Sequence, residues 1–182
     1  VNRVDDSVVR VSGGRPVILR RARGYAPEWF RLPFRVGEVV ALGAHLNNTG
    51  CVGFGNYLVP TQHIGDMDTL ESLDFLLESL EFLMKSYGLE WEGVRVASDM
   101  HPRYLTTSYA RRVAEERGIE HVRVQHHHAH VAAAMASNAL PRDSVVVGIA
   151  IDGVGYGTDG NIWGGEVLLA GYAWFERVGQ IE

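Results

Sequence analysis

The chain has 182 residues, and 46% of them are hydrophobic, which is enough for one domain or slightly more with its own core. The formal net charge of −5 argues against a nucleic-acid partner and against an anionic membrane surface, and no apolar run is long enough to span a membrane. Cys51 is the only cysteine, so intrachain disulfides are excluded and a cytoplasmic location is expected.

The first segment, residues 1–34, is strongly basic and differs in this from the rest of the chain. Two short apolar runs, Val8–Val11 and Val17–Arg20, predict a hairpin around a Gly-Gly turn. The arginines within Arg20–Pro27 have planar guanidinium groups that can bind an anion, although a solvated basic edge explains the same spacing equally well. We interpret Pro33–Glu38 as a linker, and because the chain starts without an initiator Met, we expect an internal fragment of a longer protein.

A second unit begins with three predicted strands joined by short turns. The strands are expected at Val39–Gly43, Cys51–Phe54 and Tyr57–Thr61. The polar turn between the first two carries Asn48 and Thr49, whose amide and hydroxyl groups can donate to a phosphate, but such turns are also common without a ligand. Cys51 lies within a strand without a basic neighbour, so we expect it to serve packing rather than to act as a nucleophile.

The middle of the chain alternates between helices and strands. Residues 68–88 have the apolar spacing of a core helix, with Asp68 and Glu71 as an expected capping box. A strand, a helix and a strand are then expected at Gly93–Asp99, Thr106–Arg117 and Ile119–Gln125. This alternation predicts an α/β fold with a mostly parallel sheet. Asp99 and His101 lie at the C-terminal end of a strand, at the sheet edge where such folds bind ligands, although capping of a turn explains them equally well.

Four histidines fall within five positions where the last of these strands leads into an Ala-rich helix. If the helix begins near Gln125, His126 and His130 lie one turn apart and can hold one metal ion, while His127 and His128 point elsewhere. Neutral imidazole suits zinc, iron or nickel, and two ligands leave the coordination shell incomplete. The alternative is that these histidines are hydrogen-bonded for structural reasons alone.

A Gly-rich stretch after Pro141 predicts a buried strand, a turn and a returning strand. The first strand ends at Asp152, a candidate catalytic carboxylate that orients a metal ion or a water molecule. The backbone of the turn can face phosphates, and the candidate phosphate-binding residues there are Gly153, Gly155, Gly157 and Asp159. A Gly-rich hairpin with a capping Asp explains the same pattern. Because the strands at 39–61 repeat this design, we favour a two-lobed nucleotide-binding fold.

Several motifs together are similar to those of the HypF carbamoyltransferases, a family of nickel–iron hydrogenase maturation proteins. These motifs are Asp5–Arg10, Leu19–Tyr25, Gln62–Asp66, Asp99–Tyr104, Gln125–His130 and Asp152–Glu166. The resemblance covers nearly the whole chain, which corresponds to a middle portion of a family member. It implies an actin-like and sugar-kinase-like ATPase fold, with the tail of a YrdC-like domain in residues 1–34, a first lobe in 38–141 and the start of a second lobe in 142–182.

The resemblance also implies a function. The family makes carbamoyl-adenylate from carbamoyl phosphate and ATP, and then passes the carbamoyl group to the C-terminal cysteine of HypE for synthesis of the hydrogenase cyanide ligand. The implied cofactors are ATP and a divalent metal, zinc or iron, with His126 and His130 as ligands and the remaining carboxylate ligand from a late segment that lies outside this chain. The turn reads Asn47-Asn48-Thr49 where the family pattern has a lysine, so no lysine contact to phosphate is expected.

Two other interpretations stay open. An antibiotic-type O-carbamoyltransferase shares this pair of domains but transfers the group to the hydroxyl of a small molecule. A non-catalytic interpretation is that the chain serves only to dock HypE or the remaining domains of its parent protein. Because much of the expected cleft lies outside the chain, we expect the chain alone to be inactive.

Overall fold

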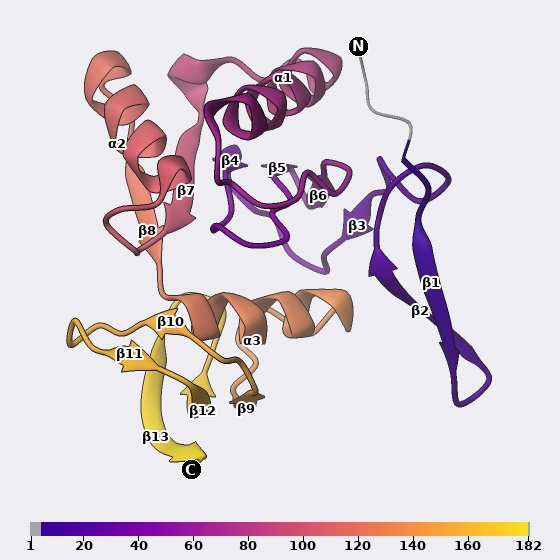
Figure 1. Ribbon diagram of the computed structural model, residues 1–182, viewed down its shortest axis with the longest axis vertical. Coiled ribbons are helices and arrows are strands. Elements are labelled where there is room, and N and C mark those ends of the chain that lie inside the picture. Colours follow the sequence, from indigo (N-terminus) through magenta and orange to yellow (C-terminus); the bar gives the residue numbers. More distant parts are fainter. Residues whose placement is uncertain (1–4, 182) are drawn as a thin grey trace.

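Helix α3 (His126–Ser137) lies between two groups of strands, and a long hairpin projects beside them (Figure 1). The structure is a computed structural model that describes residues 5–181. This part of the chain contains four sheets, with six, three, two and two strands. The fold is therefore mixed α/β, and α3 connects its two larger sheets.

The six-stranded sheet has the strand order β3-β6-β5-β4-β7-β8. Its strands are β3 (Phe30–Arg31), β4 (Val39–Ala41), β5 (Cys51–Phe54), β6 (Tyr57–Pro60), β7 (Arg95–Asp99) and β8 (His121–Val124). Strands β4, β7 and β8 are parallel, whereas β3, β6, β5 and β4 pair antiparallel. The prediction of a mostly parallel sheet is thus right only for the part with helical crossovers, because the short turns among β4, β5 and β6 permit only antiparallel pairing.

Two helices make the crossovers to the parallel strands. Helix α1 (Leu70–Tyr87) and a short 3-10 turn after it (η1, Trp91–Gly93) lead to β7. Helix α2 (Leu105–Arg117) then leads from β7 to β8. The N-cap of α1 is Thr69, whose hydroxyl accepts a hydrogen bond from the N–H of Ser72 at 3.2 Å. The expected capping box at Asp68 is therefore displaced by one residue. Each helix ends at a glycine C-cap in the left-handed conformation, with φ of 66° at Gly88 and at Gly118.

The main core lies between the six-stranded sheet and the two helices α1 and α2. Fully buried apolar side chains from the sheet and from both helices meet there. The side chains with an exposed fraction of 0% are Val40, Leu42, Val52, Val59, Leu76, Leu80, Val96 and Ala110. Their burial supplies the largest favourable contribution to the stability of this unit.

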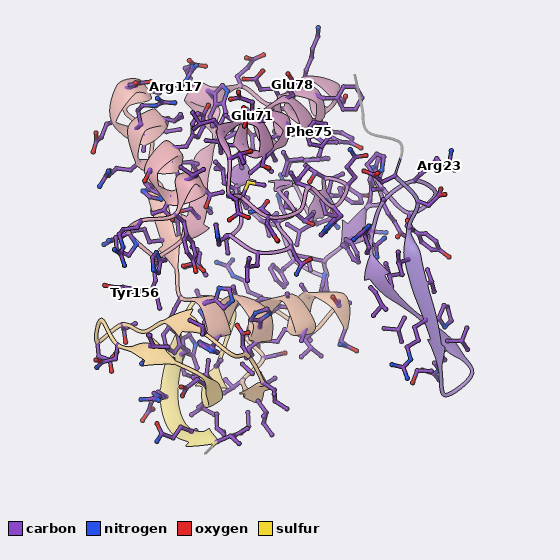
Figure 2. The ribbon with its side chains drawn as sticks, in the orientation of Figure 1. Arg23, Glu71, Phe75, Glu78, Arg117 and Tyr156 are labelled. Carbon is purple, nitrogen blue, oxygen red and sulfur yellow. The ribbon has the colours of Figure 1, made fainter. Side chains whose placement is uncertain are left out.

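The N-terminal hairpin is confirmed. Strand β1 (Val8–Ser12) pairs antiparallel with β2 (Arg15–Arg20), and every residue of β1 is exposed. At the base of the hairpin, Arg23 forms an ion pair with Asp6 at the surface. Figure 2 shows the Arg23 side chain pointing away from the six-stranded sheet. Because β3 joins the six-stranded sheet through β6, the segment before the expected linker also contributes to that sheet.

The three-stranded sheet has the order β13-β12-β9 and is antiparallel throughout. Its strands are β9 (Val146–Ala150), β12 (Gly165–Ala170) and β13 (Phe175–Ile181). The turn after β9 holds a further small hairpin, β10 (Gly155–Tyr156) with β11 (Ile162–Trp163). The expected strand, turn and returning strand are therefore present, with an additional hairpin inside the turn. None of the helices in residues 5–181 has the length and apolarity that a membrane span requires.

Candidate metal centre

The histidine cluster lies at the N-terminus of α3, as the sequence predicts. Gln125 is the N-cap, and its side-chain oxygen accepts a hydrogen bond from the N–H of His128 at 2.9 Å. The side chain of His127 is fully buried with its Nδ1 3.0 Å from the Gln125 amide, and His128 Nε2 contacts the carbonyl oxygen of Gly171 at 2.8 Å. Two of the four histidines therefore anchor α3 to its surroundings and do not face the same point as the other two.

His126, His130 and Asp152 bring three potential metal ligands together. The Nε2 atoms of His126 and His130 are 3.3 Å apart, as expected for histidines four residues apart on one helical face. Asp152 Oδ2 lies 2.9 Å from His126 Nε2 and 3.6 Å from His130 Nε2. Zinc or iron bound at the usual ~2.1 Å from each donor separates its ligand atoms by distances of this order. The two histidines and the carboxylate thus fit a divalent metal ion such as zinc or iron.

Asp99 fixes the orientation of the His126 ring from the opposite side. The Oδ2 atom of Asp99 accepts a hydrogen bond from His126 Nδ1–H at 2.7 Å, and the Asp99 side chain is only 4% exposed. With the proton on Nδ1, the lone pair of Nε2 points towards His130 and Asp152. This carboxylate–histidine arrangement is the outer support that metal-binding histidines commonly have. The location of Asp99 at the end of β7 is as the sequence predicts, and its contact with His126 is new.

The charges around the cluster favour a cation between its three donors. The hydrogen bond that His126 donates to Asp99 raises the pKa of His126, and burial lowers the pKa of His130, with the adjacent His126 adding to that shift. Burial works to raise the pKa of Asp152, but the Gly153 N–H and the neighbouring histidines outweigh it, so the pKa lies below its usual value. Among the described residues, Asp152 Oδ2 is buried without a hydrogen-bond donor. A proton or a metal ion is needed there to separate three electron-rich atoms.

A cavity of about 490 Å³ opens beside these histidines. Its lining includes Asp99 at the end of β7 and His126 and His130 on α3. On the other side, Asn48 and Thr49 line it from the turn between β4 and β5. The Asn48 amide donates to the carbonyl oxygens of Leu42 and Ala44, both at 2.9 Å, so its N–H groups hold the turn together. The side-chain hydroxyl of Thr49 forms no hydrogen bond among the described residues. Of the two residues predicted to bind phosphate in this turn, Thr49 is therefore the one with a side-chain donor to offer.

The loop after Asp152 is held mainly by its own contacts. The N–H of Gly153 donates to Asp152 Oδ1 at 2.7 Å, and the N–H of Gly157 donates to the Asn161 carbonyl at 2.8 Å. Asp159 accepts hydrogen bonds from Asn161 N–H and from Trp163 Nε1–H, both at 3.0 Å. These contacts stabilise the small hairpin, and this structural role alone explains the Asp and Gly residues of the loop. The phosphate-binding role of Gly153, Gly157 and Asp159 stays a prediction.

Gly155 has a different structural requirement. A Cβ atom at this position would lie 2.4 Å from the His127 ring, so any side chain would displace α3 or the hairpin. Gly155 therefore brings the small hairpin against the histidine helix, and a phosphate contact from its backbone also stays a prediction. Burial raises the pKa of Cys51 to about 12, which agrees with a packing role for that thiol.

A stack of aromatic rings beside the cluster was not anticipated from the sequence. The Tyr104 ring stacks on His101 with centroids 4.0 Å apart and on His45 with centroids 5.2 Å apart. Tyr156, on strand β10 of the small hairpin (Figure 2), packs in a T-shaped arrangement with His101 of the loop after β7, with ring centroids 5.2 Å apart. The signal in the sequence was the Asp99-to-Tyr104 motif, whose His and Tyr are three residues apart. This stack joins the two groups of strands next to the candidate metal cluster.

Comparison with known proteins places the chain in a family. A family model described as the HypF Kae1-like domain matches residues 35–137, and one described as the second subdomain of the carbamoyltransferase Kae1-like domain matches residues 148–182. The chain belongs to the HypF family. This confirms the resemblance that the sequence motifs suggested. The first matched region contains all strands of the six-stranded sheet except β3, and the second contains most of the three-stranded sheet.

Individual HypF proteins agree with this assignment. Carbamoyltransferase HypF of Rhizobium leguminosarum bv. viciae is 40% identical over 100% of this chain and 23% of its own length, and that of Synechocystis sp. is 37% identical over 98% and 23%. A crystal structure of full-length HypF in a phosphate- and nucleotide-bound form superimposes with a TM-score of 0.88 at 43% identity, covering 98% of this chain and 23% of that one. The chain thus spans about a quarter of the length of these HypF relatives.

Proposed function

We propose that the chain is the metal- and nucleotide-binding part of a HypF-type carbamoyltransferase. In this proposal the substrates of the parent protein are carbamoyl phosphate and ATP, and the C-terminal cysteine of HypE accepts the carbamoyl group. The observation that carries the proposal is the group of His126, His130 and Asp152 beside a 490 Å³ cavity, in a chain that belongs to the HypF family. Phosphate and nucleotide in the HypF crystal structure support ATP as a ligand.

The strand order supports the finer fold assignment within this proposal. Strands β6-β5-β4-β7-β8 form a three-stranded meander followed by two crossover strands, which is the lobe arrangement expected of an actin-like ATPase. The meander β9-β12-β13 repeats the first part of it. We therefore assign residues 38–141 to a first lobe and 142–182 to the start of a second. Residues 1–34 are proposed as the tail of a YrdC-like domain.

Each residue of the cluster has a defined task in this proposal. His126, His130 and Asp152 hold the divalent ion, which when bound supplies a Lewis acid that polarises a phosphoryl or carbamoyl oxygen. Asp99 keeps the His126 ring in the tautomer whose Nε2 is free to bind the ion. The Gly153 N–H holds the second oxygen of Asp152, so that Oδ2 faces the histidines. The ligands are thereby oriented before any substrate arrives, which lowers the cost of binding it.

The phosphate groups of the nucleotide are proposed to enter the cavity that these ligands border. The Thr49 hydroxyl on its wall can donate to a phosphate oxygen. The backbone of the 153–159 loop, with Gly153, Gly155, Gly157 and Asp159, is the second proposed contact. Asn48 acts indirectly, because its amide hydrogen bonds fix the turn that presents Thr49.

The proposal is tested in the full-length parent protein by measuring carbamoylation of the HypE cysteine with mass spectrometry. His130→Ala and Asp152→Asn are each expected to lower the transfer rate at least about 100-fold, since each removes a ligand of the ion that stabilises developing charge. Asp143→Asn, a change at an exposed residue, is the matched control and should leave the rate unchanged. Formation of carbamoyl-adenylate, measured by ATP–pyrophosphate exchange, should persist in all three variants, because the resemblance to the HypF family assigns this step to the YrdC-like domain.

Full transfer activity in both ligand variants would overturn the proposal. Loss of adenylate formation together with transfer would contradict the assignment of the two steps to separate domains. A full-length protein that transfers nothing to HypE even without a substitution would also overturn the proposal, and would favour the docking or the O-carbamoyltransferase interpretation.

A further inference from the structure

Strand β8 forms one of the two open edges of the six-stranded sheet, on the side away from the N-terminal hairpin (Figure 1). Within residues 5–181 it pairs with β7 alone. It has four residues, whereas β3 at the opposite edge has two. An edge strand presents a row of N–H and C=O groups to which another extended chain can bind. The edge of β8 is therefore a place where a further strand can join the sheet.

The hydrogen bonds between β7 and β8 show which main-chain groups of β8 face outwards. Amides of β7 and of the residue after it donate to the carbonyl groups of Glu120 and Val124, at 2.9 and 3.0 Å. In a parallel pair, alternate residues of a strand bond to the neighbouring strand, and the residues between them point to the other side. The N–H and C=O groups of His121 and Arg123 therefore face away from β7, where no strand of the described residues lies.

The side chains of His121 and Arg123 lie on the same face of β8, since residues two apart in a strand point to the same side. His121 Nε2 is 2.9 Å from the Oγ atom of Ser98 on β7. Burial lowers the pKa of His121, and the nearby Arg123 and Arg111 lower it further. Arg111 belongs to α2. Guanidinium groups from the strand and from the adjacent helix thus converge beside the outward-facing main chain.

Arg111 and Arg123 are exposed and available to a partner. Within the described part of the chain, neither forms an ion pair or a hydrogen bond. The other two arginines of α2, Arg112 and Arg117, are paired with glutamates at 4.0 and 3.2 Å. Glu120 lies on the opposite face of the strand, because successive residues of a strand point to opposite sides. A chain with a formal net charge of −5 thus presents these two guanidinium groups beside an open strand edge.

We propose that the β8 edge binds an extended acidic segment of another protein, which joins the six-stranded sheet as a further strand. The main chain of this segment bonds to the outward-facing groups of His121 and Arg123. Its acidic side chains reach Arg111 and Arg123, which are the charged groups on that face. Because alternate side chains of a strand share a face, the segment carries its carboxylates two residues apart. The main chain gives affinity and the alternating carboxylates give specificity.

The charge of this edge decides against a second copy of the chain as the partner. The β8 strand of a second copy brings its own Arg111 and Arg123 to the shared edge, and like charges that face each other across a strand pair are destabilising. Charged residues on edge strands commonly prevent such self-pairing. The same positive charge attracts an acidic segment, so it selects between the two kinds of partner.

This interaction surface is independent of the proposed function. Arg111, His121 and Arg123 are not among the three candidate metal ligands, and they do not line the 490 Å³ cavity. Binding at β8 can therefore be measured without metal, nucleotide or transfer activity. A failure of this proposal and a failure of the proposed function are distinguishable for the same reason.

The test is a titration of the isotope-labelled chain with a short synthetic peptide in which glutamate and valine alternate, followed by amide hydrogen exchange in NMR spectra. Exchange of the His121 and Arg123 amides should slow when the peptide binds, because these N–H groups become bonded to it. The Val122 and Val124 amides face β7 already, so their exchange should change little. This alternating protection is the signature of an added strand.

Variants and altered peptides separate the contributions of charge and main chain. Arg111→Gln and Arg123→Gln should each weaken peptide binding about threefold or more, as measured by fluorescence anisotropy, since each removes one partner of an exposed ion pair. Arg112→Gln is the matched control on α2, because Arg112 is already paired with Glu116, and it should leave binding unchanged. A peptide with glutamine in place of glutamate, and one that is N-methylated at alternate residues, should both bind more weakly than the original.

Three results would overturn the proposal. One is unchanged exchange of the His121 and Arg123 amides at saturating peptide. Another is equal binding of the peptides N-methylated in either alternate register and of the original, or equal weakening by Arg112→Gln and Arg123→Gln, because general charge would then explain the attraction. The third is displacement of the peptide by short single-stranded DNA at an equal concentration, which would make the edge a general anion surface and not a site for an acidic protein segment.

Discussion

The two larger sheets begin with the same meander of three strands, yet they bury these strands by different means. In the six-stranded sheet, β4 pairs with β7 at its other edge and α1 packs on the sheet, so Val40, Val52 and Val59 are fully buried. In the three-stranded sheet, β9 is an edge strand, and Val147 and Ile149 are 66% and 62% exposed. Strands of similar apolar sequence thus become core or surface according to what packs beside them.

The three-stranded sheet relies on a buried ion pair as well as on a small core. The Glu166 side chain is 1% exposed and accepts hydrogen bonds from Arg177 Nε at 2.6 Å and Arg177 Nη2 at 2.9 Å. The Arg177 guanidinium also lies over the Trp163 ring, 4.5 Å from its centroid. The two units therefore respond to different substitutions, and the candidate metal centre depends on both, since Asp99 is the last residue of β7 and Asp152 follows β9.

The largest effect on stability is expected in the core of the six-stranded sheet. Leu80 is fully buried between α1 and the sheet, so Leu80→Ala should lower the free energy of unfolding by about 3 kcal/mol. Leu70→Ala is the matched control on the same helix, because Leu70 is 66% exposed, and it should cost less than about 0.5 kcal/mol. Urea unfolding followed by circular dichroism measures both. Equal losses in the two variants would contradict the assignment of α1 as the main covering helix.

Asp99→Asn tests the contribution of the six-stranded sheet to the metal centre. We expect metal affinity to fall by about 10- to 100-fold, the usual cost of removing the partner of a metal-binding histidine. Fold stability should change little by comparison. Calorimetric titration with zinc measures the affinity, and Asp143→Asn at an exposed position is the control. Unchanged affinity in Asp99→Asn would mean that the carboxylate does not orient His126.

The same variant makes a prediction about pH. A proton on His126 competes with the metal, and the Asp99 hydrogen bond raises the pKa of His126. Metal affinity should therefore fall as the pH drops through this raised pKa. In Asp99→Asn the pKa is lower, so the fall should move to lower pH even though affinity near neutral pH is weaker. A shift towards higher pH would contradict this account of the Asp99 contact.

A smaller loss of stability is expected from the ion pair of the three-stranded sheet. Arg177→Met leaves Glu166 buried without a partner and should lower the melting temperature. Because the Arg177 side chain is 33% exposed, solvent screens the pair, and we expect a smaller loss than for Leu80→Ala. The double variant Glu166→Leu with Arg177→Met should recover most of the loss. A double variant as unstable as the single one would show that packing, and not the buried charge, is responsible.

The smallest change in stability is expected at the edge strand. Val147→Lys replaces an exposed side chain of β9 and should alter the free energy of unfolding by less than about 0.5 kcal/mol. It should nevertheless reduce self-association of the chain, because a charge on an edge strand opposes pairing with another copy. Sedimentation velocity at several concentrations measures this. A large loss of stability would mean that β9 is buried in solution.

Local patterns in the sequence predicted much of the fold and part of the site. The spacing of His126 and His130 defines their separation once the helix is placed, and the apolar run before Asp152 places that carboxylate at the end of a strand. Both follow from contacts between residues near in sequence. The position of Thr69 as N-cap instead of Asp68 shows the usual uncertainty of one residue at a helix end.

Contacts between distant segments could not be predicted in the same way. Asp99 and His126 meet only because β7 and β8 lie side by side in the sheet. The Asn48 amide is occupied by Leu42 and Ala44 because the turn folds back on itself, which the composition of the turn does not reveal. The antiparallel half of the six-stranded sheet likewise depends on turn lengths more than on the alternation of helices and strands.

The most direct test of the central claim is the metal content of the purified, untagged chain, measured by elemental analysis after dialysis against a zinc- and iron-containing buffer. The intact chain is expected to keep one divalent ion per molecule, and the variant with His126→Ala and His130→Ala is expected to keep none while remaining folded. An intact chain that keeps no metal, or a double variant that keeps as much as the intact chain, would contradict the proposal that His126, His130 and Asp152 form a metal centre.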